Sequence, residues 1–197
     1  MMTFLGVTDY ASDYGLAKLF VYQEKKQKKA VYHFAIVFGD IRGKEHVFCR
    51  VHSACITAEA FHAVNCDCRG QLDQAFTLAK KMDGVIIYLQ QEGRGNGIEA
   101  KLLQMQLEQQ YKIDTISAFQ KGGFPADNRT YESAAFMLKN LAVQSVILHT
   151  ADRNKIKQLQ DLGIPVSARM HPKVNLKNAI AKRNLKAKQK KLHYFSK

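Results

Sequence analysis

The hydrophobic positions of the chain recur with two different periods, and together they predict a mixture of strands and helices. Runs rich in Val, Ile, Phe and Tyr predict strands over Val31–Phe38, His46–Val51, Val85–Leu89 and Ser145–Leu148. Apolar residues at helical spacing predict helices over Gly70–Met82, Ile98–Tyr111, Tyr131–Leu141 and Asn154–Leu162. Gly39–Gly43 predicts a turn that joins the first two strands in a hairpin. Hairpins early in the chain and alternating elements later predict an α+β (mixed α/β) fold, with a mixed sheet and flanking helices.

The composition excludes several classes of protein. The 197 residues are 46% hydrophobic and 24% charged, values that exclude collagen-like and wholly disordered chains. No run of about 18 uncharged apolar residues is present, so no transmembrane helix is predicted. The N-terminal residues lack the basic and apolar regions of a signal peptide. We therefore expect a cytoplasmic protein, without membrane contact, whose four cysteines stay reduced.

Positive charge is concentrated toward the C-terminus. The formal net charge is +13; ten Lys or Arg residues follow Leu162, and no acidic residue follows Asp161. Asn175–Leu192 can be helical but lacks a broad apolar face. The sequence therefore predicts a domain over 1–172 and a basic tail over 173–197. The tail is interpreted either as a solvated helix or extension, or as a platform for phosphate-rich partners such as nucleic acid. A smaller basic cluster, Lys25–Lys29, predicts an exposed hairpin loop.

Three of the four cysteines are spaced as a candidate zinc site. Cys55, Cys66 and Cys68 form the pattern C-x10-C-x-C, and a catalytic zinc ion takes three protein ligands with a fourth position left for water. An extended segment would point Cys66 and Cys68 to the same side, because strand side chains alternate. The same pattern also fits buried reduced thiols. Two nearby histidines could compete as ligands, His52 and His62. Cys49 lies inside a predicted strand and is interpreted as a buried small residue.

Two polar loops carry groups suited to a nucleotide. Gln91–Gly97 follows a predicted buried strand and precedes a predicted helix, and its three glycines let a ligand approach the backbone. Arg94 could bind phosphate there, and Glu92 could accept hydrogen bonds from a guanine. The same segment also fits an ordinary tight turn. A second segment, Gly122–Arg129, ends with a carboxylate and a guanidinium two residues apart, and the carboxylate, Asp127, could instead cap the helix that follows.

Taken together, these segments resemble the GTP cyclohydrolase II family, which comprises zinc enzymes of riboflavin synthesis. The resemblance extends from about Val31 to Val166, which is most of the chain. It rests on the order and spacing of seven segments: Arg50–Cys55, Asn65–Leu72, Gln91–Arg94, Asp114–Thr115, Gly123–Arg129, Leu148–Thr150 and Lys155.

The resemblance implies a hydrolase that opens the guanine ring of GTP at C8 and releases pyrophosphate. It implies one zinc ion per chain at Cys55, Cys66 and Cys68, which activates water for the attack, Mg2+ on the GTP phosphates, and a homodimer. Asp127 matches the family's proton acceptor, and Arg129 matches a nucleophile toward the α-phosphate, with a phosphate clamp as the alternative role. The matching substrate-contacting positions are Arg50, Val51, His52, Ser53, Ala54, Gln71, Glu92, Gly93, Arg94, Thr115, Thr150 and Lys155.

Three departures from the family pattern bear on the product. The family usually has Glu at Ala54, Asn-Ile-Gly at Gly95–Gly97, and a catalytic tyrosine at Met105. A phenol can relay a proton and a thioether cannot, so Met105 predicts a slow second hydrolysis and a product that retains the formyl group. Three alternatives remain: an enzyme that also releases formate, Met105 as an ordinary core residue, and a catalytically silent homologue that binds nucleotide or RNA.

Overall fold

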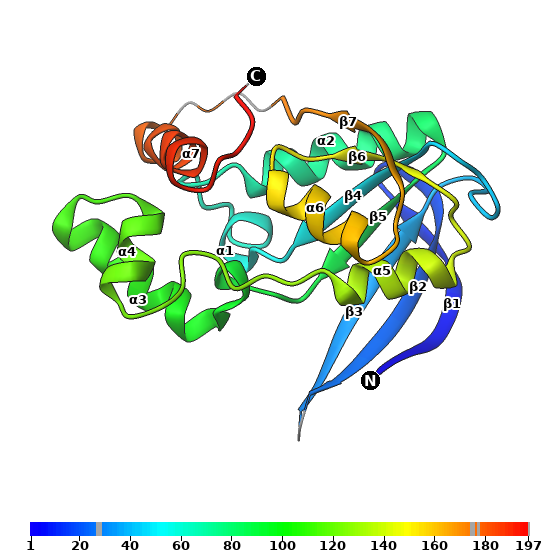
Figure 1. The fold of residues 1–197 in the computed structure, drawn as a ribbon, viewed down its shortest axis with the longest axis horizontal. Helices are drawn as coiled ribbons and strands as arrows, with labels where there is room; N and C mark the ends of the chain where they lie inside the picture. The colour runs from blue at the N-terminus through cyan, green and yellow to red at the C-terminus, as the bar shows by residue number, and fades with distance from the viewer. Residues whose placement is uncertain (27–28, 174–175, 177, 197) are drawn as a thin grey trace. The chain divides into compact units, whose positions relative to one another are not determined.

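The chain folds into two compact units, and each is built from three separate stretches of sequence. The structure, a computed structural model, describes residues 1–26, 29–173, 176 and 178–196 (Figure 1). The sheet unit comprises Met1–His52, Leu72–Gln90 and Tyr131–Pro172. The helical unit comprises Ser53–Gln71, Gln91–Thr130 and Lys173–Lys197. Within the described residues, no helix has the length and apolar character needed to cross a membrane.

The sheet is mixed and has seven strands in the order β1-β2-β3-β5-β4-β6-β7. The strands are β1 (Met2–Ser12), β2 (Gly15–Lys26), β3 (Lys29–Val37), β4 (Val47–Ser53), β5 (Gly84–Leu89), β6 (Val146–His149) and β7 (Val166–Met170). Strands β1, β2, β3 and β5 pair antiparallel, whereas β4, β6 and β7 pair parallel. The predicted hairpin between the third and fourth strands is wrong, because β5 lies between β3 and β4.

Helices cover both faces of this sheet, as the alternation of its side chains requires. The helices are α2 (Cys68–Met82), α5 (Glu132–Asn140) and α6 (Arg153–Asp161). Ile36 on β3 and Ile86 on β5 pack with Ala75 and Ala79 of α2. Their neighbours along the same strands, such as Val37, pack on the opposite side with residues of α5 and α6. The core therefore has two layers, since successive strand residues point to opposite faces.

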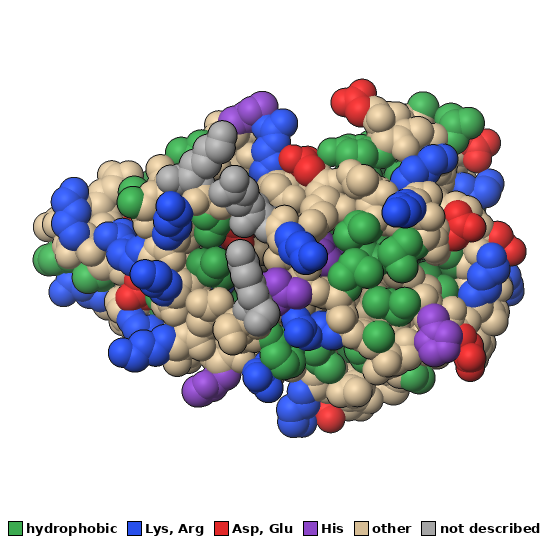
Figure 2. Space-filling view, turned by 90° about the horizontal axis from the view of Figure 1, so that it is seen from above, with side chains coloured by type: hydrophobic (Ala, Val, Ile, Leu, Met, Phe, Trp, Pro, Cys, Tyr) green, Lys and Arg blue, Asp and Glu red, His purple; other side chains and the backbone are tan. Residues whose placement is uncertain are grey.

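The helical unit consists of helices and connecting loops that carry many of the candidate site residues. Its elements are α1 (Ile56–Glu59), the 3-10 turn η1 (Gly93–Gly95), α3 (Gly97–Tyr111), α4 (Thr115–Lys121) and α7 (Ala179–Lys191). Helix α3 packs against α4, and α4 packs against α7. On the face seen in Figure 2, Lys and Arg side chains lie densely over this unit.

The C-terminal segment is a packed part of the helical unit. Asn178 caps α7, and Ala181, Asn184 and Ala187 form a narrow buried stripe at a spacing of three residues. The interpretation of residues 173–197 as a solvated extension is therefore wrong for the described residues. The stripe is small and interrupted by an asparagine, which is why the sequence shows no broad apolar face. Four residues of the predicted helix and tail lie outside the described residues: Val174, Asn175, Lys177 and Lys197.

The predicted fold class is confirmed: the fold is a mixed sheet with flanking helices and antiparallel hairpins near the N-terminus. The helices predicted over Gly70–Met82 and Ile98–Tyr111 lie within two residues of α2 and α3. The division into a domain over 1–172 and a tail over 173–197 stays a prediction. In the cluster predicted as a hairpin loop, Gln27 and Lys28 lie outside the described residues.

Candidate active site

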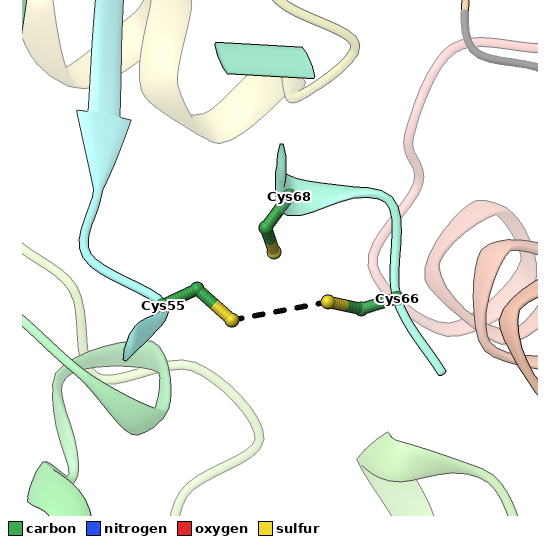
Figure 3. A group of neighbouring side chains, drawn as sticks. All are labelled: Cys55, Cys66 and Cys68. Atoms are coloured by element: carbon green, nitrogen blue, oxygen red, sulfur yellow. Dashed lines mark hydrogen bonds between the residues drawn. The ribbon is translucent and has the colours of Figure 1, made fainter. Parts of the chain in front are cut away.

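Three thiol groups converge in the helical unit. Cys55 immediately precedes α1, Cys66 lies in the loop before α2, and Cys68 is the first residue of α2. Their Sγ atoms all lie within 4.8 Å of one another, and the Sγ atoms of Cys55 and Cys66 are 3.8 Å apart. Figure 3 shows the three sulfur atoms pointing toward a common centre. Among the described residues, no other group of His, Cys, Asp or Glu side chains is placed to hold a metal ion.

The spacing of the sulfur atoms suits a tetrahedral ion. Zn–S bonds are about 2.3 Å long, which places two sulfur ligands of a tetrahedral site about 3.8 Å apart. The Cys55–Cys66 separation has this value. Three thiolates also leave one coordination position for water, as a catalytic zinc site requires. The donor set therefore fits zinc.

The local backbone differs from the prediction. Cys66 and Cys68 do not lie on one side of an extended segment, because Cys66 sits in a bend and Cys68 begins a helix. The change of direction at the helix start, rather than strand alternation, brings the two thiols together. Cys49 is fully buried in β4, which confirms its structural interpretation. Neither candidate histidine, His52 or His62, joins the described metal-ligating group.

A buried lysine supplies positive charge beside the thiols. The Lys101 ammonium lies 3.1 Å from Cys55 Sγ and 2.7 Å from Glu92 Oε1. Hydrogen bonds from Cys66 and Cys68, together with the Lys101 charge, hold the pKa of the Cys55 thiol well below its usual value. The same bond to Cys55 raises the pKa of Cys66 to about 11. The cluster therefore holds one thiolate that two thiols and one ammonium stabilise.

Replacing Lys101 with methionine is expected to weaken zinc binding by about 10- to 100-fold, as loss of a group that supports metal ligands does. Methionine keeps the length of the side chain and removes its charge. Competition with a chromogenic chelator measures the change, and Lys44→Met, at an exposed position in the sheet unit, is the control. An unchanged affinity would mean that the Lys101 ammonium serves only Glu92.

Glu92 joins three elements of the helical unit. Its Oε2 accepts a hydrogen bond from the Ile56 amide at 2.8 Å, and its Oε1 accepts one from the Gly93 amide at 2.9 Å as well as the bond from Lys101. The carboxylate thereby fixes the start of α1 and of η1 next to α3. Contact between Glu92 and a guanine base stays a prediction.

The glycine loop meets the second polar loop at Gly95. A Cβ at Gly95 would lie 2.5 Å from the Asn128 carbonyl oxygen, and its φ of +83° is unfavourable for other residues. The Asn128 amide donates to the Arg94 carbonyl at 2.9 Å. A glycine at position 95 therefore lets the segments Gln91–Gly97 and Gly122–Arg129 pack in direct contact.

Two arginines share one carboxylate where these segments meet. Arg129 donates to Asp127 from Nε at 2.8 Å and from Nη2 at 2.6 Å, and the Arg94 Nη2 donates to the same carboxylate. The three side chains are only 10–17% exposed. Burial favours a higher pKa for Asp127, but the hydrogen bonds and charge of Arg129 and the charge of Arg94 prevail and lower it to about 2. Asp127 is not a helix cap, because α5 begins at Glu132 with Tyr131 at its N-cap.

Comparison with known proteins places this arrangement in a family. The family model for GTP cyclohydrolase II matches residues 7–171. The chain belongs to the GTP cyclohydrolase II family. It is 43% identical over 139 residues to a GTP cyclohydrolase-2 of Aeromonas hydrophila, with 70% of each chain covered. It is 33% identical over 171 residues to a GTP cyclohydrolase-2 of Picrophilus torridus, with 86% of this chain and 87% of that protein covered.

A longer relative matches beyond the family model. The riboflavin biosynthesis protein RibBA of Endomicrobium trichonymphae is 33% identical over 190 residues, which cover 96% of this chain and 46% of that protein. A match of this extent includes much of Lys173–Lys197. The predicted family and enzyme class, a GTP cyclohydrolase II-type hydrolase, are confirmed.

The family resemblance also named residues in the sheet unit, and five of them lie together there. Their side chains or backbones meet at the ends of the parallel strands β4 and β6: Arg50, Val51, His52, Thr150 and Lys155. The Arg50 Nη1 donates to the His149 carbonyl at 2.9 Å, and the Lys155 Nζ donates to the Val51 carbonyl at 2.6 Å. Arg50 and Lys155 are buried cations, a combination suited to binding phosphate.

The other named residues lie in the helical unit. Gln91 Nε2 donates to Ser53 Oγ at 3.3 Å, and Thr115 begins α4 with its amide bonded to Asn184 Oδ1 at 3.0 Å. The remaining named residues there are Ala54, which is buried, Gln71, which pairs with Asp67, and Gly93, which begins η1. Substrate contact by any of these residues stays a prediction.

Met105 lies on α3 and is partly exposed. It lines a cavity of about 190 Å³ together with Glu108 of α3 and with Ile180 and Arg183 of α7. The thioether is therefore at a cavity wall and is not enclosed in a core.

Two residues that contact the site were absent from the sequence prediction, Lys101 and Tyr194. Lys101 lies about one turn after the glycine loop, on a helix that the sequence indicates only by its apolar residues. A single lysine among 30 Lys and Arg residues gives no signal of burial. Tyr194 follows a lysine-rich helix, and only the fold brings its hydroxyl to Arg129, at 2.8 Å.

Proposed function

We propose that this member of the GTP cyclohydrolase II family is a zinc-dependent hydrolase that opens the imidazole ring of GTP at C8, releases pyrophosphate and leaves the formyl group on the product. The observation that carries the proposal is that one compact unit holds both a three-thiol cluster and the Arg94–Asp127–Arg129 cluster. The first cluster suits hydrolysis at carbon, and the second suits a phosphate ester. A homodimer and Mg2+ on the GTP phosphates are part of the same proposal.

At the cysteine cluster, the chain supplies both the negative charge of the sulfur ligands and a positive charge that partly balances it. Cys55, Cys66 and Cys68 would hold the zinc ion, which when bound supplies a Lewis acid for water activation. Lys101 offsets the charge of the thiolates, and Glu92 holds its ammonium in place at 2.7 Å. The buried position of Lys101 makes this electrostatic contribution stronger than it would be in bulk water.

At the phosphate end, the geometry favours a clamp over a nucleophile. A guanidinium must lose its proton to attack phosphorus, and Arg129 is held by an ionised carboxylate that stabilises the protonated form. Asp127, with a pKa of about 2, is a weak proton acceptor in this pairing. We therefore assign Arg129 and Arg94 to binding the α-phosphate, with Asp127 orienting both guanidinium groups.

Retention of the formyl group follows from the side chain at position 105. Ring opening consumes one water and pyrophosphate release a second, and formate release needs a third attack on an amide that has already moved. A phenol at this position could donate a proton to the departing nitrogen, but the thioether of Met105 cannot. Loss of such a proton donor slows a step by about 10²- to 10⁴-fold, which lets the formylated product leave first.

Incubation of the zinc-loaded protein with GTP and Mg2+ tests the proposal. Mass spectrometry of the products should show a pyrimidinone nucleotide that retains the formyl carbon, with one pyrophosphate released per GTP consumed. Equal amounts of formate and pyrophosphate from the start would instead identify an enzyme that also hydrolyses the formamide. Binding of GTP without turnover would identify a silent homologue.

Replacing Met105 with tyrosine is expected to raise formate release by about tenfold or more while GTP consumption changes little, because the new phenol restores a proton donor. Formate and pyrophosphate are measured in the same time course. Met82→Tyr, which adds a phenol at the C-terminal end of α2, is the matched control and should release no additional formate. An equal effect of the two substitutions would contradict the role of position 105.

A further inference from the structure

The C-terminal segment is bonded to the parts of the helical unit that carry the site. Asn184 of α7 accepts a hydrogen bond from the Thr115 amide at 3.0 Å and donates to the Asn65 carbonyl at 3.3 Å. Asn65 directly precedes Cys66, and Thr115 is one of the residues assigned to substrate binding. A single buried side chain of α7 thus joins the cysteine loop to the start of α4.

Two lysines of α7 extend this attachment. Lys188 pairs with Asp67 at 3.1 Å, and the two side chains are only 14% and 8% exposed. Asp67 lies between Cys66 and Cys68, so the pair fixes the stretch of chain, at the start of α2, that carries two of the three thiols. Lys191 pairs with Asp114, the N-cap of α4, at 2.7 Å. These contacts fix the position of α7, and therefore the position from which the residues after Lys191 extend.

The segment after α7 places the Tyr194 hydroxyl beside the guanidinium groups of Arg129 and Arg94. The Tyr194 hydroxyl oxygen accepts a hydrogen bond from the Arg129 Nη2 at 2.8 Å and lies 3.4 Å from the Arg94 Nη2. Arg129 also donates to Asp127 from Nε and Nη2. Acceptors at two places around one planar guanidinium fix both its position and the orientation of its plane.

We propose that Tyr194 is a positioning residue for Arg129, so that the segment after α7 is a working part of the active site. The inference rests on the proposed function of Arg129 as a phosphate clamp. A side chain that is already held in its binding orientation loses little conformational freedom when the ligand arrives, and affinity gains accordingly. Tyrosine suits this role because its oxygen is an uncharged acceptor. A second carboxylate would hold Arg129 equally well but would repel the phosphate.

The test uses the full-length, zinc-loaded protein and a variant that removes only the acceptor, Tyr194→Phe. Inorganic tripolyphosphate serves as a probe of the phosphate clamp, and calorimetry measures its affinity. We expect the variant to bind tripolyphosphate about 10-fold more weakly and to show a similar rise in the KM for GTP, with zinc content and melting temperature unchanged. The matched control is Tyr111→Phe, which removes the hydroxyl of an exposed tyrosine on α3 and should alter none of these values.

A second variant separates positioning from packing. Tyr194→Glu restores an acceptor but adds charge, so it should keep the melting temperature and lose more tripolyphosphate affinity than Tyr194→Phe. Wild-type affinity in both variants would overturn the proposal, as would a wild-type protein that does not bind tripolyphosphate. Because tripolyphosphate has no guanine ring, weaker binding in Tyr194→Phe supports the inference even where the wild-type protein fails to open the GTP ring. In that case the proposed function alone fails.

Discussion

Replacing Cys66 with serine is expected to remove the zinc ion and the ring-opening activity together. A serine hydroxyl is not ionised near neutral pH and is a poor ligand for zinc. Structural zinc sites with four ligands bind with about 10–16 kcal/mol, so loss of one ligand costs about 3 kcal/mol, or more than about 100-fold in affinity. Metal content by atomic emission and GTP consumption by chromatography should fall in parallel.

The fourth cysteine provides a control for this result. Cys49 lies in the core of the sheet unit and is not one of the three clustered cysteines. Cys49→Ala should keep one zinc per chain and nearly full turnover, with at most a small loss of stability. If Cys66→Ser kept its activity after dialysis against a chelator, the cysteine cluster would not be the reaction centre.

Replacing Arg129 with alanine is expected to reduce pyrophosphate release by about 10²- to 10³-fold or more, the range seen when a group that stabilises a charged transition state is removed. Arg129→Lys should recover only part of the rate, because an ammonium cannot reproduce the two-pronged bond to Asp127. Pyrophosphate is measured in a coupled assay. Arg42→Ala, at an exposed turn of the sheet unit, should release pyrophosphate at the wild-type rate.

The same substitution should change the response of the protein to acid. In the folded protein the pKa of Asp127 is about 2, below the usual value near 3.9 for an unfolded chain. A lowered pKa contributes stability at pH values above the unfolded pKa, and this contribution is lost as the pH falls toward 2. Arg129→Ala removes the main cause of the lowering, so acid unfolding should begin at a higher pH. An unchanged acid midpoint would show that Arg94 alone sustains the ionised carboxylate.

Local patterns predicted the elements of the fold better than their arrangement. The helix over Gly70–Met82 is indicated by apolar residues at helical spacing within one short segment. This pattern can be recognised without knowing what the helix packs against. By contrast, the place of β5 between β3 and β4 depends on pairing between residues far apart in the chain, which no local period reveals. Strand β1 was not predicted because most of its side chains are exposed and its apolar residues do not alternate regularly.

The candidate site divides in the same way. The cysteine pattern and the loops around Glu92 and Asp127 carry unusual residue combinations at short spacings, so the sequence alone indicates them. Lys101 and Tyr194 lie in sequence segments that carry no unusual combination of residues. Only their contacts in the folded chain place them at the candidate site. The net positive charge of the tail indicates a solvated or anion-binding segment and gives no sign that the tail packs on the rest of the helical unit. That packing depends on ion pairs of Lys188 and Lys191 with acidic residues more than 70 positions earlier.

The division of the helical unit among three stretches of sequence sets an order of events during protein synthesis. Cys68, the last of the three clustered cysteines, leaves the ribosome 126 residues before Tyr194. At about 5–20 residues per second this is roughly 6–25 s earlier. During that interval the cysteine loop lacks Asn184 and Lys188, the side chains that hold it in the finished fold. Zinc that arrives early therefore meets thiols that α7 does not yet hold in place, and the final geometry of the metal centre is set only when α7 docks.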